Sequence, residues 1–440
     1  MELWIGIDGT DSPYGGCTTW TMSNIIDRLM TVDSNLEFLD YPNLIRLDPN
    51  IPYKTRGNGA LSLHIRTNLS IDYLSDLIVG QILADQSHYR LNPDKQPGLL
   101  ICQEKPPVHI YQQALQHLLT VADIRSDFEP LFVWPDWNTS HIGAAAAIAA
   151  DLTDDFTFEL LAYRFLDNCR TPREINPRRL QELSLQYPSV FSSYDDRQHR
   201  ELICPAGPDP IFCGIRGESV DDLKIFFKEL RITEELHSYT IFRTNQATDA
   251  HVSQANRSNI PYDVYSGDIL VTQIPDEIQG GHVFSKGYDG QQYLGLNWFE
   301  PTKKLRDRAR NLLPGDRIYI DGAVIDDDHV RSVNVEYMMI ISAPDRIIRS
   351  PPICECGQRM TSAGTFAGYK CKSCGHRSKF SELEIRHRAL FTGQMVFSSK
   401  SAQRHLTRPL ERLHRKNTSI PNQILFHHFR TIYHQSYIKQ

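Results

Sequence analysis

Two close pairs of cysteines near the end of the 440-residue chain constrain its fold more than any other feature. The pairs are Cys354-Glu-Cys356 and Cys371-Lys-Ser-Cys374. Four thiolates on two short turns can surround one tetrahedral zinc ion, and a segment this short cannot build a core without such a link. We therefore predict a zinc ribbon over residues 350–380, with unpaired structural cysteines as the alternative. The first pair is Cys-x-Cys rather than the usual Cys-x-x-Cys, which makes His376 a possible substitute ligand.

Length and composition place the chain among multidomain globular proteins. About 100 to 200 residues form one domain, so this length predicts several. Apolar residues make up 40% and charged residues 23%, which excludes disordered and fibrous classes. No stretch approaches the roughly 18 apolar residues that a membrane-spanning helix needs. The N-terminus has no basic region followed by a cleavage site, and the other five cysteines are scattered. We expect a cytoplasmic protein with reduced thiols and no membrane partner.

Charge is distributed unevenly along the chain. Residues 351–440 hold 15 Lys and Arg against 4 Asp and Glu, whereas residues 1–350 hold 32 against 49. A basic end on an acidic body indicates a polyanionic partner, although solvated surface charge explains many such imbalances.

The first 130 residues predict an α/β unit. An apolar run at Leu3–Ile7 leads into a loop of small and acidic residues, and apolar residues then recur at helical spacing from Met22 to Leu29. Strand-like runs at residues 44–47 and 60–65 flank a second loop rich in glycine.

Three further segments complete the predicted multidomain α+β fold. Residues 131–250 alternate strand-like and helix-like runs, which favours a ferredoxin-like domain. Residues 262–345 contain about five short strands separated by Gly-rich turns, as a small OB-fold β-barrel requires. After the ribbon, residues 381–440 form a basic C-terminal segment, which we expect to be helical.

The loop after the first strand is a candidate nucleotide site. Asp8 ends the strand and Asp11 follows it, so both carboxylates can hold Mg²⁺ on the phosphates of a nucleotide. The Gly15-Gly16 pair would let the backbone approach those phosphates, and the Thr18-Thr19 pair offers hydroxyls near a helix start. Because Asp, Ser and Gly are also ordinary turn formers, a simple turn is the alternative.

Two cations in the second loop are candidate phosphate ligands. Lys54 and Arg56 stand beside Gly57 and Gly59, and a cation on a glycine-flanked loop can reach an oxyanion that bulkier neighbours would block. The alternative is a solvated turn.

The basic C-terminal segment interleaves cations with aromatic residues. Cations neutralise phosphates and aromatic rings stack on unpaired bases, which suits a looped RNA. The alternative is a basic tail packed on the acidic body. The candidate RNA-binding residues are Arg404, His405, Arg408, Arg412, Arg415, Lys416 and Arg430.

Several blocks, taken in order, resemble one known family. The opening block, Trp4-Ile-Gly-Ile-Asp8-Gly-Thr-Asp11-Ser, looks like the start of the archaeal 2-agmatinylcytidine (agmatidine) synthetases that act on isoleucine tRNA, the TiaS family. Together the blocks cover nearly the whole chain. The further blocks are Ile51-Pro-Tyr-Lys-Thr-Arg-Gly-Asn-Gly59, Ile142-Gly-Ala, Glu159-Leu-Leu-Ala-Tyr-Arg164, Cys213-Gly-Ile-Arg-Gly-Glu-Ser219, Thr244-Asn-Gln-Ala-Thr-Asp249, Gly280-Gly-His-Val-Phe284, Phe299-Glu-Pro-Thr-Lys303 and Ala402-Gln-Arg404-His-Leu.

The resemblance implies a four-part enzyme: a kinase-like domain over residues 1–130, then the ferredoxin-like domain, the OB fold and the zinc ribbon. Such enzymes use ATP to phosphorylate carbon 2 of the wobble cytidine in tRNA-Ile with a CAU anticodon, and the amine of agmatine then displaces the phosphate. ATP is split to AMP. By its position in the motif Thr18 would be the autophosphorylated threonine, with Asp8 and Asp11 holding Mg²⁺ as catalytic groups.

Agmatine is a dication and needs carboxylates around it. Glu218, Asp249 and Glu300 lie in family-like blocks and are the candidates. One departure stands in the opening loop, where the family pattern Ile-Asp-Asp-Thr-Asp is replaced by a sequence with Gly9 at the second Asp. Two other hypotheses therefore stay open. One is a non-catalytic tRNA-binding protein with a degenerate ATP site, and the other is an ATP-dependent kinase or ligase that uses another amine.

Overall fold

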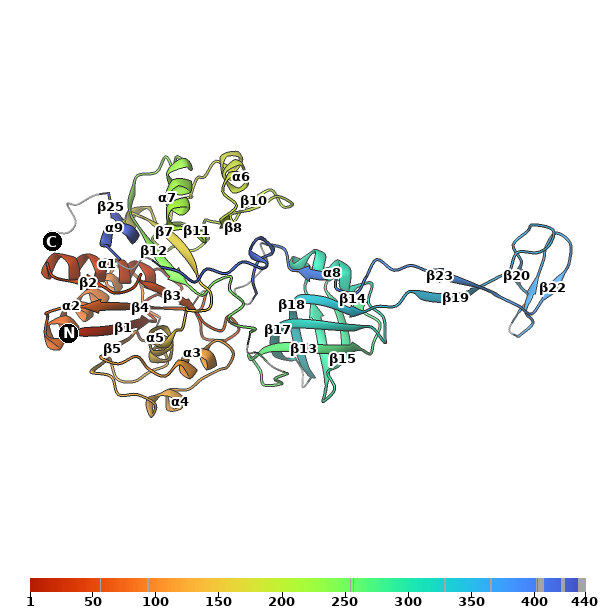
Figure 1. Cartoon of the computed structure of the whole chain (residues 1–440), viewed down its shortest axis with the longest axis horizontal. Coiled ribbons are helices and arrows are strands. Elements are labelled where there is room, and N and C mark those ends of the chain that lie inside the picture. The colour runs from red at the N-terminus through yellow and green to blue at the C-terminus, as the bar shows by residue number, and fades with distance from the viewer. Residues whose placement is uncertain are drawn as a thin grey trace.

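The structure, a computed structural model, describes residues 1–433 apart from 56, 93–94, 254, 256, 328–329, 365, 401, 403–406 and 421–423. Three bodies follow one another along the molecule (Figure 1). A large α/β body stands at one end, a β-barrel lies in the middle, and a small unit projects on a thin two-stranded stalk at the other end. The predicted site residues Arg56, Arg404 and His405 lie outside the described residues.

The α/β body is built on one eleven-stranded sheet. Its strands are β1 (Glu2–Asp8), β2 (Glu37–Phe38), β3 (Asn43–Arg46), β4 (Gly59–Arg66), β5 (Gly98–Cys102), β6 (Phe132–Trp134), β7 (Thr157–Arg164), β8 (Val190–Phe191), β11 (Ile211–Gly217), β12 (Leu236–Thr244) and β25 (Arg430–Ile432). The order is β6-β5-β1-β4-β3-β12-β7-β11-β8, with β2 beside β4 and β25 beside β12. A separate hairpin joins β9 (Tyr194–Asp195) and β10 (Arg200–Glu201).

Helices cover this sheet and hold its apolar side chains away from water. They are α1 (Thr18–Val32), α2 (Ile71–Gln86), α3 (Val108–Ala114), α4 (Ala122–Arg125), α5 (Ser140–Ala149), α6 (Pro177–Gln186), α7 (Val220–Glu229) and the 3₁₀ turn η1 (Leu166–Asn168). The predicted strand, loop and helix at the start of the chain are confirmed as β1 and α1, because the helical-period residues from Met22 to Leu29 are fully buried.

Small residues let α5 lie directly on the first half of the sheet. Its partners are β1, β4 and β5. A Cβ atom at Gly6 of β1 would lie 2.4 Å from the carbonyl oxygen of Ala144, so only glycine fits there. Although α5 begins after residue 130, it therefore packs with the elements that precede that position.

One short parallel pairing joins the two halves of the sheet. β12 is antiparallel to β7 along most of its length, and on its other edge Arg243 pairs with Asn43 and Thr244 with Leu44 of β3. The sheet thus continues from the first predicted unit into the second.

The middle body is a closed five-stranded barrel, as predicted. Its strands are β13 (Val264–Val271), β15 (Val283–Tyr288), β16 (Tyr293–Trp298), β17 (Arg317–Asp327) and β18 (Val330–Ser342). They pair in the order β13-β17-β18-β16-β15, and β15 returns to β13 to close the ring. Short elements attach to it, namely β14 (Asp276–Glu277), η2 (Glu300–Thr302), α8 (Lys304–Ala309) and β24 (Met395–Phe397). Its apolar core, around Trp298 and Ile320, is separate from that of the α/β body.

The last body is small and has almost no apolar core. β19 (Arg346–Ser350) and β23 (Glu382–Arg386) form the stalk, and beyond it stand β20 (Thr361–Ser362), β21 (Tyr369–Lys370) and β22 (Arg377–Ser378). Its buried cluster consists of Cys354, Met360 and Cys371. A unit this small needs the predicted link between its cysteines.

After the stalk the chain returns past the barrel to the α/β body (Figure 1). We call residues 407–420 and 424–433 the strap. Over the described residues of this segment the expected helical tail is wrong, because the strap contains only the 3₁₀ turn η3 (Leu410–Arg412), the short α9 (Phe426–Phe429) and β25. Its arginines bind acids that lie far apart on the body, and these tertiary contacts outweigh local helix propensity.

Candidate active site

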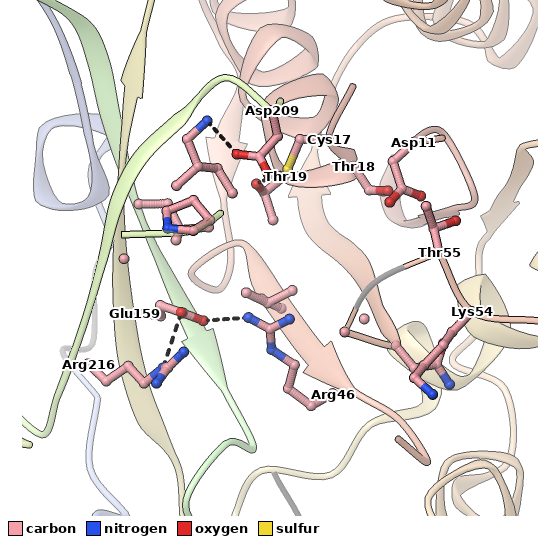
Figure 2. Close-up of a pocket in the computed structure, with 18 of the residues that line it drawn as sticks. Asp11, Cys17, Thr18, Thr19, Arg46, Lys54, Thr55, Glu159, Asp209 and Arg216 are labelled. Carbon is pink, nitrogen blue, oxygen red and sulfur yellow. Dashed lines mark hydrogen bonds and ion pairs between the residues drawn. The ribbon is translucent and has the colours of Figure 1, made fainter. Parts of the chain in front are cut away.

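A cavity of about 240 Å³ opens where the two halves of the large sheet meet. From the first half it is lined by the end of β1, the start of α1 and the loop before β4. From the second half it is lined by β7, β11 and the loop before β11. Figure 2 shows polar side chains from both halves around this space. A concave pocket with a few convergent polar groups is the usual form of a small-molecule site.

The two predicted carboxylates both line the cavity. Asp8 is buried at the end of β1, and its Oδ1 accepts a hydrogen bond of 2.6 Å from the amide of Gly9. Burial raises the pKa of Asp8 to about 6, although the positive charge of Lys95 opposes the rise. Gly143 of α5 leaves room for this carboxylate, because a Cβ atom there would lie 2.3 Å from Oδ2. The Asp8 carboxylate is therefore closely packed and largely shielded from water.

Thr18 and Thr19 form the first turn of α1 and also line the cavity. No side chain caps this helix, since Cys17 at the cap position makes no capping hydrogen bond. The first amide groups of a helix have no partner within it and carry partial positive charge, which attracts anions. Figure 2 places Thr18 beside Asp11. The start of α1 thus combines hydroxyls, amides and a nearby carboxylate.

The two predicted glycines of this loop have another role. Gly15 and Gly16 do not appear among the residues that line the cavity. Both have positive φ, and a Cβ atom on Gly16 would lie 2.2 Å from the ring of Tyr89. The Tyr89 hydroxyl donates to the carbonyl oxygen of Thr10. Room for this ring requires glycine at both positions, and their approach to a phosphate stays an untested prediction.

Lysines on the cavity wall come from two loops. Lys54 lies there as predicted. Lys95, which the sequence analysis missed, stands before β5, and its Nζ lies 3.4 Å from the hydroxyl of Thr55. No motif surrounds Lys95 in the sequence, so only the fold reveals it.

A buried acid held by two arginines forms the opposite wall. The Glu159 carboxylate lies 3.0 Å from Arg46 and 3.3 Å from Arg216 (Figure 2). Burial pushes the pKa of Glu159 up, but the two guanidinium groups outweigh it and hold the pKa below its ordinary value. The sequence contained a signal for this group, since Glu159 and Arg216 belong to two of the family-like blocks.

Asp209 is the second acid of that wall and was also missed. It is buried in the loop before β11, and its Oδ1 accepts from the amide of Ile211 at 3.2 Å. Arg173 lies 3.4 Å from the same oxygen. The cavity is therefore lined by carboxylates from both halves of the sheet and by two lysines from the first half.

The four cysteines of the ribbon meet as predicted. Their Sγ atoms all lie within 4.8 Å of one another. In each knuckle the glycine amide bonds back to a cysteine carbonyl, from Gly357 to Cys354 and from Gly375 to Cys371. Four thiols at this spacing fit one tetrahedral zinc ion. Within the described chain His376 does not join the cluster, so the Cys-x-Cys pair needs no substitute.

Comparison with known proteins agrees with this arrangement. Three family models match: the TiaS TCKD domain over residues 4–131, the TiaS FLD domain over residues 138–251, and the TiaS C-terminal zinc ribbon domain over residues 351–390. The 2-agmatinylcytidine synthetase TiaS of Archaeoglobus fulgidus, an enzyme of isoleucine tRNA, is 34% identical over 431 residues, which cover 94% of this chain and 98% of that protein. The chain belongs to the TiaS family.

Other TiaS proteins match with similar coverage. The enzyme of Staphylothermus marinus is 32% identical, over 96% of this chain and 95% of that protein. The crystal structure of apo TiaS superposes with a TM-score of 0.82 at 31% identity, covering 96% of this chain and all of that one. The complex of TiaS with its isoleucine tRNA, AMPCPP and agmatine superposes with a TM-score of 0.80 at 28% identity, over 96% of this chain and 99% of that one.

The three acids predicted for agmatine do not meet in this TiaS protein. None of them lines the cavity. Glu218 binds Arg412 and Arg415 of the strap, and Asp249 binds Arg408. Glu300 belongs to the barrel, where it pairs with its neighbour Lys303. Each carboxylate is already matched by a cation of the protein.

The strap arginines predicted to bind tRNA divide into two groups. Arg408, Arg412 and Arg430 are buried, and each is paired with an acid of the α/β body. This pairing favours the alternative of a basic tail packed on the acidic body, and the tRNA contact of these three arginines stays an untested prediction. Arg415 and Lys416 are exposed.

Among the described helices, none combines the length and the apolar character that crossing a bilayer requires.

Gly9, where the TiaS pattern has Asp, is enclosed. Its φ is +70°, and a Cβ atom there would lie 2.2 Å from the hydroxyl of Ser140 and 2.9 Å from the carbonyl oxygen of Gln96. Ser140 Oγ donates to that same carbonyl at 2.6 Å. In this chain the first residue of α5 fills the space beside Gly9.

Restoring the family residue alone should therefore damage the protein. We expect Gly9→Asp to lower the free energy of unfolding by about 1–3 kcal/mol, because it adds a collision to a strained backbone. Ser140→Gly in the same chain should recover part of the loss. Urea unfolding measures both. Gly315→Asp is the matched control, since Gly315 has a φ of +96° with no atom near the new Cβ. A loss for Gly9→Asp no larger than for Gly315→Asp would contradict the collision.

Zinc should stabilise the ribbon and leave the other bodies unaffected. The ribbon's buried cluster is separate from the cores of the barrel and the α/β body. We expect Cys371→Ser to lose bound zinc and tRNA affinity without lowering the main thermal unfolding temperature. Metal analysis, a tRNA-binding titration and calorimetry measure these effects, with Cys169→Ser as the control outside the cluster. Unfolding of the whole chain on zinc loss would show that the bodies depend on one another.

Proposed function

We propose that this chain is a 2-agmatinylcytidine synthetase of isoleucine tRNA, which joins agmatine to carbon 2 of the wobble cytidine at the expense of ATP. The observation that carries the proposal is the full-length similarity to TiaS, including a structure that holds the tRNA, AMPCPP and agmatine together. The cavity at the sheet junction is lined by carboxylates and cationic side chains from both halves of the sheet. Because tRNA and ATP are its substrates, we assign the enzyme to the cytoplasm.

The domains would divide the work along the chain. We assign residues 1–130 to a kinase-like catalytic domain and 131–250 to a ferredoxin-like domain. Residues 262–345 would be an OB fold, 350–380 the zinc ribbon, and 381–440 the basic C-terminal segment. The ranges matched by the three family models and the closed barrel support this division. The ribbon, which projects on its stalk, would contact tRNA far from the cavity.

ATP would bind with its phosphates at the start of α1. The amides of the first helical turn and the ammonium groups of Lys54 and Lys95 favour a polyanion there. Asp8 and Asp11 fit a magnesium ion, because Mg²⁺ commonly takes one or two protein carboxylates and completes its shell with phosphate oxygens and water. When bound, Mg²⁺ would neutralise charge that develops on the phosphates.

The reaction needs two displacements. The oxygen on carbon 2 of cytosine is a poor leaving group, so a phosphoryl group of ATP is first transferred to it, and the rest of the nucleotide leaves. The primary amine of agmatine then attacks carbon 2; the carbon–nitrogen bond forms, the carbon–oxygen bond breaks, and phosphate leaves with the electron pair while the amine loses a proton. Thr18, at the cavity, would accept a second phosphoryl group from the nucleotide on its hydroxyl oxygen, which loses its proton; after both transfers AMP is left. The protein's share is positioning and charge stabilisation.

Asp209 is our choice for binding agmatine. It lines the cavity, whereas Glu218, Asp249 and Glu300 lie outside it and are matched by cations. Glu159 is held by two arginines, which leaves little negative charge for a cationic substrate. Arg173 lies 3.4 Å from Oδ1 of Asp209, farther than Arg46 and Arg216 lie from Glu159. A guanidinium or ammonium group would find its partner there.

Gly9 favours a second candidate, a tRNA-binding protein without activity. The missing carboxylate is at the nucleotide loop, so loss of ATP binding would follow. Binding of a fluorescent ATP analogue separates the two functions, because a protein that only binds tRNA has no use for a nucleotide.

Labelled agmatine tests the main proposal directly. With ATP and Mg²⁺, we expect this chain to incorporate it into a tRNA-Ile transcript with a CAU anticodon. Thr18→Ala should abolish incorporation, since it removes the acceptor hydroxyl, and Thr18→Ser should retain it. A transcript with another anticodon is the negative control. No incorporation by the unaltered chain, together with tight tRNA binding, would favour the inactive alternative, and incorporation of a different amine would redefine the substrate.

The assignment of Asp209 has its own test. Asp209→Asn should raise the KM for agmatine roughly 10- to 100-fold, the loss expected for one hydrogen bond to a charged group. The KM for ATP should stay unchanged. Glu300→Gln, which removes one of the three acids that the sequence predicted for agmatine, should leave both KM values unchanged. A larger effect of Glu300→Gln than of Asp209→Asn on the agmatine KM would favour Glu300 of the barrel as the acid that binds agmatine.

A further inference from the structure

The strap pairs with the edge of β12 at the junction of the two halves of the sheet. β12 has β7 along one edge, and its other edge is shared by two strands. β3 pairs with Arg243 and Thr244, whereas β25 pairs antiparallel with residues 238–240. Figure 1 shows the strap crossing to this edge beside α1. β25 therefore occupies the part of β12 that the first half of the sheet leaves uncovered.

An aromatic anchor holds the strap against the first half. Phe429, the last residue of α9, is fully buried, with its ring centroid 5.0 Å from that of Phe38 and 6.1 Å from that of Tyr41. Ile424 forms a bridge with Phe38. The strap thus touches both halves, through apolar packing on one and backbone pairing on the other.

Arg430 is the polar centre of this contact. It is 1% exposed, and its guanidinium binds both carboxylate oxygens of Asp27 on α1, at 3.0 and 2.6 Å. The same group donates to the carbonyl oxygen of Tyr239 and the hydroxyl of Thr240 on β12. A buried guanidinium without such partners would be costly, so its position ties α1 to β12.

A line of polar side chains runs from Arg430 to the cavity. Thr19, Ser23 and Asp27 lie four residues apart and share one face of α1. Ser23 Oγ lies 2.8 Å from the hydroxyl of Thr240 and donates to the carbonyl oxygen of Thr19 at 2.8 Å. Thr19 lines the cavity next to Thr18. The face of α1 that meets β12 and the strap therefore leads to the helix start that faces the site.

We propose that Arg430 is a positioning residue for the active site. By clamping α1 to β12 it sets the distance between the cavity wall that carries Thr18 and the wall that carries Glu159 and Asp209. The strap is then a structural part of the catalytic centre, although none of its described residues lines the cavity. The inference rests on the proposed function only for its activity readout.

The strap itself supplies a matched control. Arg412 is 0% exposed, and its partners Asp155, Glu218 and Ala247 all belong to the second half of the sheet and its loops. Arg412→Met removes a buried arginine from the same segment without touching α1. Arg430→Met removes the one that binds α1. Any difference between the two variants reports the position of α1 rather than docking of the strap in general.

Two measurements on the full chain test the proposal. Hydrogen–deuterium exchange of α1 should rise in Arg430→Met and Asp27→Asn, and should stay unchanged in Arg412→Met. With tRNA, ATP and agmatine, kcat for agmatine incorporation should fall roughly tenfold to a hundredfold in the first two variants, as displacement by about 1 Å would cause, while the KM for agmatine and tRNA affinity stay constant. Ser23→Ala, a small change, should lower kcat in the same direction.

Other outcomes either overturn the positioning role of Arg430 or separate it from the proposed function. Equal effects of Arg430→Met and Arg412→Met on exchange and kcat would overturn the proposal and leave the strap a general stabiliser. If Arg430→Met fails to fold, unchanged α1 exchange in both Asp27→Asn and Ser23→Ala would overturn it. If the unaltered chain incorporates no agmatine, but α1 exchange still rises in Arg430→Met and not in Arg412→Met, the positioning role is supported and only the proposed function is contradicted.

Discussion

The parallel pairing of β12 with β3 is the interaction on which the rest of the structure depends. Two residue pairs, Arg243 with Asn43 and Thr244 with Leu44, convert two α/β units into one sheet. Without them the cavity would have one wall, because the opening loop comes from one unit, and Glu159 and Asp209 come from the other. Such a short contact cannot hold two domains by itself. The remaining edge of β12 is closed by β25.

Charge explains how the end of the chain finds this edge. The sequence places an excess of cations after residue 350 and an excess of acids before it. Part of that imbalance is neutralised within the molecule, where Arg408 and Arg412 share Asp155 and Arg430 binds Asp27. Buried ion pairs add little net stability but strongly penalise wrong arrangements, in which a charge would lose its partner. The arginines therefore specify where the strap lies.

Gly9 shows how a family pattern can change without collapse of the site. Gly9 stands where the TiaS pattern has a second Asp, and the hydroxyl of Ser140, which donates to the carbonyl oxygen of Gln96, lies where a side chain on residue 9 would begin. Asp8 is left as the buried carboxylate at the end of β1, with a raised pKa. The space beside Gly9 is thus filled by α5, a helix far from the loop in sequence and in direct contact with it in space.

The sequence by itself determined the features that depend on near neighbours. The cysteine knuckles, the strand, loop and helix around Asp8 and Thr18, the barrel strands and the ordered family blocks are all local patterns, and the structure has them where they were expected. Only tertiary structure decided which distant residues meet. Arg46 and Glu159 are 113 residues apart, and Asp27 and Arg430 are 403 apart. The sequence does not distinguish an arginine that binds RNA from one that binds an acid of its own chain. Burial and partner residues decide between the two, and only the fold supplies them.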